Sequence, residues 1–179
     1  TVDTPPACLS SLPSMRPPMA SHSITTGSPP LYVAICFAVV EAVACYMESL
    51  ARREDHWTLG GTDAVRYQDA RFRLLTDNYY VPLAEFSSWS RQRLQADPQI
   101  GKLYSQAAGL AHFLIHDQEG RYRDALVACL ESIYSGRDRP GTLAELTGVP
   151  FADLDREYRA FMEVPDSPPE EIPAAGRDD

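Results

Sequence analysis

The stretch IGKLYSQAAGLAHFLI, residues 100–115, has the apolar pattern that decides the fold class. Its apolar residues recur at spacings of three and four along the chain: Leu103, Tyr104, Ala107, Leu110, Ala111, Leu114 and Ile115. This spacing places them on one broad side of a helix, which must be buried against other elements. Gly120 then interrupts the pattern.

Similar patterns occur on both sides of this stretch. Downstream, residues 122–133 and 151–162 each carry an apolar stripe at helical spacing, and Gly136 ends the first of them. Upstream, residues 64–75 and 89–94 also favour helices. Thr142 and Glu145 resemble a capping box that starts a short helix, which Gly148 would end. The segment HWTLGG, residues 56–61, is typical of a short strand without an obvious partner. The predicted architecture is mainly α.

Composition limits the domain organisation and the partners. The chain has 179 residues, enough for one domain with a substantial core. Pro, Ser and Thr dominate residues 1–30, which we interpret as a disordered leader, and residues 164–179 as a disordered acidic tail. The helical domain would therefore span residues 31–163. A net charge of −9 argues against nucleic acid as a partner.

Residues 31–47 form an apolar stretch with one acid, Glu41, in its middle. Seventeen residues interrupted by a carboxylate are a poor match to the ~20 apolar residues of a membrane span, so we predict a buried helix. A buried carboxyl group stays protonated, pairs with a cation or binds a metal. Farther along, Glu48 and Arg52 have the spacing of an exposed helical ion pair.

The four cysteines, Cys8, Cys36, Cys45 and Cys129, show no metal-binding spacing, and three of them lie in apolar stretches. We favour buried free thiols over a disulfide framework.

The segments VVEAVACYMESL (39–50), LYSQAAGLAHFLIHDQEGRYRDALVACLESIYSG (103–136) and LAELTGVPFADLDREYRAFM (143–162) together resemble the gluzincin-like metallopeptidase family. The resemblance covers about residues 37–162. It implies a helical peptidase domain in which Glu41 corresponds to the third zinc ligand. Tyr104 is a candidate for the downstream tyrosine that often stabilises the oxyanion in this family, but its place on the buried stripe favours a role in core packing.

The chain departs from the family at the catalytic motif. A gluzincin holds zinc with two histidines of an HExxH helix, whose glutamate activates the metal-bound water. No histidine here is followed by glutamate, and only His22 precedes Glu41. The resemblance therefore implies the C-terminal part of a peptidase domain that lacks its catalytic helix. Zinc is possible by this resemblance, but we expect no tight binding by this chain alone.

His112 and His116 have the i, i+4 spacing of a metal pair, although Phe113 replaces the catalytic glutamate. A rebuilt zinc site from Glu41, His112 and His116 is conceivable in a helical bundle. The alternative, which we favour, is that His112 occupies a packed position of the family, while His116 faces solvent near a helix C-terminus, where the helix dipole favours it.

Three functions are consistent with these observations. The first is a truncated or degenerate metallopeptidase-like domain, inactive as given, which would expose an apolar face and self-associate. The second is a helical module that binds a peptide or protein partner on a peptidase-like scaffold. The third is a zinc hydrolase rebuilt from Glu41, His112 and His116.

Overall fold

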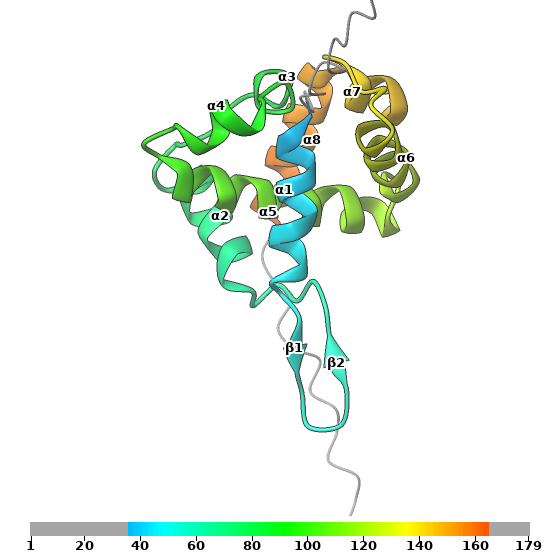
Figure 1. Ribbon diagram of the computed structural model, residues 1–179. Helices are drawn as coiled ribbons and strands as arrows, with labels where there is room; N and C mark the ends of the chain where they lie inside the picture. The colour runs from blue at the N-terminus through cyan, green and yellow to red at the C-terminus, as the bar shows by residue number, and fades with distance from the viewer. Residues whose placement is uncertain (1–35, 165–179) are drawn as a thin grey trace, which may run out of the picture. The chain divides into compact units, whose positions relative to one another are not determined.

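A computed structural model describes residues 36–164 (Figure 1). The chain divides into two units, residues 1–31 and 32–179, and every described residue lies in the second. The described part is mainly helical, with one short two-stranded sheet, which confirms the predicted fold class. The predicted leader lies outside the described residues, as does the predicted tail except for Val164.

Helix α5, Ile100–His116, is the central element of this unit (Figure 1). It contacts α1 (Phe37–Met47) and α2 (Val65–Leu75) most extensively, and also α4 (Arg91–Gln95), α6 (Arg123–Tyr134) and α8 (Phe151–Glu163). Leu103 and every residue from Ser105 to Leu114 are buried, so the buried surface extends around the helix. Other helices surround α5, so it is buried on more sides than the single broad face that the sequence predicted.

Helix α1 carries the acid that drew attention in the sequence. It begins at Phe37, and residues 31–35 of the predicted helix lie outside the described residues. Its buried side packs against α5: Ala38, Val39, Ala42, Cys45 and Tyr46. The backbone N–H of Cys36 donates to Asp138 Oδ2 at 2.9 Å, which ties the start of α1 to the loop after α6. Because α1 ends at Met47, the predicted pair of Glu48 with Arg52 is wrong: Arg52 lies on a strand.

Strands β1 (Ala51–Arg52) and β2 (Trp57–Thr58) form an antiparallel hairpin after α1. The strand predicted in residues 56–61 is confirmed, and its missing partner is the segment just upstream. The Gly60 N–H donates to Ser49 Oγ at 2.7 Å, which ties the end of the hairpin to the segment just after α1. Gly60 has a φ of +74°, a conformation that glycine adopts without strain.

The other helices are α3 (Leu83–Phe86), η1 (Asp117–Glu119) and α7 (Thr142–Thr147). Helix α3 was not predicted, because four residues are too few to show a period. The short helix before Gly148 is confirmed, and Gly148 ends it with a positive φ. The capping box is wrong: Thr142 Oγ1 accepts from the Arg139 N–H at 2.9 Å, and Glu145 forms an ion pair with Arg139.

Cys36, Cys45 and Cys129 are buried free thiols, as predicted, and Cys8 lies outside the described residues. Within residues 36–164, no helix has the length and hydrophobicity that a bilayer crossing requires.

Candidate functional site

Glu41 and Tyr104, which the family resemblance singled out, lie on α1 and α5 within electrostatic reach of each other. Both are partly buried. Burial raises the pKa of the Tyr104 phenol, and the negative charge of Glu41 raises it further. The Arg66 guanidinium lies 5.7 Å from the centre of the Tyr104 ring and opposes this shift. The structure thus brings two predicted site residues together beside a cation.

The described residues do not fit a zinc centre. No three His, Cys, Asp or Glu side chains in residues 36–164 gather closely enough to hold a metal ion, so Glu41 is not joined to His112 and His116. A zinc site needs at least three protein ligands around the ion. The arrangement around Glu41 supplies a phenol and a guanidinium instead, and we derive no catalytic step through a metal.

His112 lies in the core of the unit, with 2% of its surface exposed. The Tyr67 ring stacks on its imidazole at 4.3 Å between ring centres, and the Tyr46 ring meets it edge-on at 5.0 Å. Burial lowers the pKa of His112 to about 4, and the neighbouring His116 contributes to this shift. The imidazole is therefore neutral near pH 7, and neither nitrogen forms a hydrogen bond with another residue of the 36–164 segment. The prediction of a packed core residue is confirmed.

His116 is the last residue of α5 and is exposed, as predicted. One nitrogen of its ring nevertheless contacts another side chain. Its Nε2 lies 3.0 Å from the Tyr46 hydroxyl, at hydrogen-bond distance. We expected the helix dipole to favour its protonated form. The pKa of His116 is instead lowered, first because the ring is partly desolvated and second because Arg123 repels a positive charge there.

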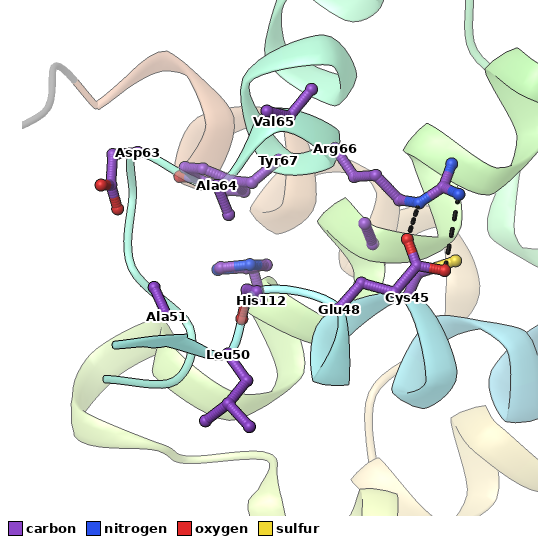
Figure 2. Close-up of a pocket in the computed structure, with 12 residues that line it drawn as sticks. Cys45, Glu48, Leu50, Ala51, Asp63, Ala64, Val65, Arg66, Tyr67 and His112 are labelled. Carbon is purple, nitrogen blue, oxygen red and sulfur yellow. Dashed lines mark hydrogen bonds and ion pairs between the residues drawn. The ribbon is translucent and has the colours of Figure 1, made fainter. Parts of the chain in front are cut away.

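A pocket of about 250 Å³ opens beside the C-terminal end of α1 (Figure 2). The end of α1 and the start of the hairpin form one side, residues 63–67 at the start of α2 form a second, and Ala108 and His112 of α5 form a third. Figure 2 shows the His112 ring projecting into this space. The pocket thus collects residues from three segments that are distant in sequence.

Two ion pairs lie at the edge of the pocket. Arg66 pairs with Glu48, in the position where we had expected Arg52 (Figure 2). Arg53 Nη2 contacts Asp63 Oδ2 at 2.7 Å. All four side chains are more than a third exposed, so each pair contributes at most about 1 kcal/mol to stability. This pocket could not be predicted from the sequence, because it depends on the tertiary packing of α1 and α2 on α5.

Comparisons of the chain with protein-family models, with curated proteins and with solved structures each found no match. The gluzincin-like resemblance therefore stays a prediction.

Proposed function

We propose that this chain is a catalytically inactive, gluzincin-like helical domain that works as a binding module, and that the pocket beside α1 receives a side chain of a peptide or protein partner. One observation carries the proposal: the buried, neutral imidazole of His112 faces the pocket without a hydrogen-bond partner among residues 36–164. Among the described residues, the fully buried side-chain atoms without a hydrogen-bond partner do not include the nitrogens of His112, so these nitrogens keep access to the pocket and can bond to a ligand there.

The same residues argue against catalysis at this pocket. A general base works best when its pKa lies near the operating pH, whereas the pKa of His112 is about 4. The donor set around Glu41 does not fit the zinc ion that the family chemistry requires. Glu41 as a third zinc ligand would need two further ligands, which the described residues do not supply. The site rebuilt from Glu41, His112 and His116 lacks them as well, because these three side chains do not gather.

The size and edge of the pocket favour a side chain over a large ligand. Sites for drug-sized ligands usually measure about 300–1,000 Å³, so about 250 Å³ suits one side chain or a very small molecule. Leu50 and Val65 line the pocket and are 51% and 77% exposed. These apolar side chains would contact the residues that flank the inserted one.

Selection of displayed peptides on the purified full chain tests the proposal. The affinity of selected peptides is then measured by fluorescence polarisation for the wild type, Ala64→Phe and Ala160→Phe. Ala64 lines the pocket, whereas Ala160 is exposed on α8 and serves as a control of equal added bulk. We expect Ala64→Phe alone to abolish binding. Peptides that bind both variants like the wild type would show that the pocket is not the binding site.

A further inference from the structure

Acidic side chains outnumber basic ones in the lining of the pocket. Glu48 and Asp63 line it, and each faces one arginine, Arg66 and Arg53 respectively. Glu41 lies outside the lining but acts electrostatically on Cys45, which lines the pocket, and on Tyr104, where Arg91 acts as well. Glu41 forms no ion pair with any residue of the 36–164 segment. Among the charged side chains that line the pocket itself, two are acids, Glu48 and Asp63, and one is a base, Arg66.

The wall at His112 adds no positive charge to offset this excess. Its imidazole is neutral at pH 7 because burial opposes protonation. A neutral imidazole offers one nitrogen lone pair as a hydrogen-bond acceptor, whichever tautomer is present. The carboxylate of Glu48 offers further acceptor sites at the edge, and its half-exposed pair with Arg66 is weak enough to be shared with a ligand.

We infer that the pocket takes an organic cation, the guanidinium or ammonium group of a basic side chain on the partner; this inference rests on the proposed function. A guanidinium has five N–H donors and an ammonium has three, and neither has an acceptor. Such a group matches a site made of an imidazole lone pair and carboxylates. A carboxylate ligand would instead lie beside Glu48 and Asp63, against their negative charges.

Three small probes separate charge from shape. N-acetyl-arginine amide, N-acetyl-citrulline amide and N-acetyl-glutamate amide are titrated into the full chain at pH 7 and followed by NMR of the backbone amides and histidine ring nitrogens. Citrulline has nearly the shape of arginine without its charge. We expect saturable shifts at Ala64, Tyr67 and His112 with the arginine probe, and affinity about fivefold or more lower with citrulline, because charge-assisted hydrogen bonds are stronger.

Citrulline binding as tightly as arginine, or glutamate binding more tightly than both, would overturn the inferred cation while leaving the pocket a binding site. The absence of shifts at the pocket with all three probes would also overturn it. The peptide selection decides the proposed function separately. Peptides that depend on Ala64 but contain no basic residue would support the module and refute the cation.

Two matched variants then locate the charge. Glu48→Gln removes the acid at the pocket edge, and we expect it to weaken the arginine probe about threefold. Glu145→Gln removes an acid of similar exposure that pairs with Arg139 away from the pocket, and we expect no change. Equal losses in both variants would show that the net charge of the chain attracts the probe, and would overturn a cation site at this pocket.

Discussion

The imidazole of His112 lies among Tyr67, Tyr46 and His116, and this environment makes stability depend on pH. Burial lowers its pKa from 6.5 to about 4 in the folded chain. Between these values the unfolded chain binds a proton that the folded chain does not, so stability is complete above pH 6.5 and falls as the pH drops toward 4. The difference corresponds to about 3 kcal/mol over this window.

We therefore predict that His112→Phe flattens the pH dependence between 6.5 and 4 while it keeps the stability at pH 7.5. Phenylalanine preserves the ring contacts, and no hydrogen bond to the rest of residues 36–164 is lost. Urea unfolding at several pH values measures the effect, with His56→Gln on the exposed hairpin as a control. Coincident pH profiles of wild type and His112→Phe would refute it.

The hydrogen bond between Tyr46 and His116 predicts a second effect. It links α1 to the end of α5 across 70 positions of the sequence, at 3.0 Å. Tyr46→Phe should lower the free energy of unfolding by about 1 kcal/mol, the usual net value of one such bond. A double-mutant cycle with His116→Gln checks the cause, because the two losses should be less than additive if the bond exists. Strict additivity would show that the two side chains act independently.

Single residues show where prediction from the sequence succeeds and where it stops. The i, i+4 spacing correctly placed His112 and His116 on one helix, and the packed position of His112 was expected from the family resemblance. The contacts of Tyr46 with His116 and of Arg66 with Glu48 could not be predicted, since they join residues 70 and 18 positions apart. Local spacing instead predicted an ion pair between Glu48 and Arg52 on one helix. That pair does not form, because α1 ends at Met47.

Two glycines within helix α5 test how the central element packs. A Cβ on Gly101 would meet no atom within 4 Å, whereas one on Gly109 would lie 2.3 Å from Met162 Cε and 2.6 Å from the Tyr158 hydroxyl. We predict that Gly101→Ala stabilises the protein by up to about 1 kcal/mol, because alanine favours the helix. Gly109→Ala should destabilise it by about 1–3 kcal/mol, because the core has no room for the added methyl group.

Chemical denaturation of both variants measures this contrast, and each serves as the control for the other. Equal effects would mean that α8 does not pack closely on α5 at Gly109.

The elements with several helical turns were predictable, since their period of 3.6 residues recurs often enough to be detected. The helices α2, α5, α6 and α8 all coincide with predicted stripes. The short elements were harder to predict, because α3 has four residues and each strand has two, too few to show a period. At α7 the right residue types for a capping box were present, but Gly141 precedes the first turn and Thr142 bonds to Arg139 instead.

The whole chain offers a direct test of the rebuilt zinc site. A metal that binds only the folded state raises its stability according to concentration and affinity. We predict that added zinc leaves the melting temperature unchanged, because the described residues contain no group of three ligands. Differential scanning fluorimetry with and without zinc, on wild type and Glu41→Ala, measures this. A rise in melting temperature with zinc that is lost in Glu41→Ala, but kept in the control Glu54→Ala on the hairpin, would support the rebuilt site.

The association state separates a binding module from a peptidase fragment. A fragment that lacks a packing helix leaves a broad apolar face uncovered and associates through it. In the described unit, a single core cluster brings together side chains from α1, α2, α5, α6 and α8, nearly all with only a few per cent of their surface exposed. Of the eleven most exposed large apolar side chains, five lie between the end of α1 and the start of α2: Met47, Leu50, Trp57, Leu59 and Val65.

We therefore predict that the full chain sediments as one defined species, a monomer or dimer, over a wide concentration range. The buried side chains form one core cluster, and the exposed apolar residues near the hairpin lie where the proposed partner would bind. Sedimentation velocity at increasing concentration measures this, and Leu50→Lys tests whether any dimer forms through the edge of the pocket. A continuous distribution of growing aggregates, unaffected by Leu50→Lys, would instead support a fragment whose missing helix covers another face.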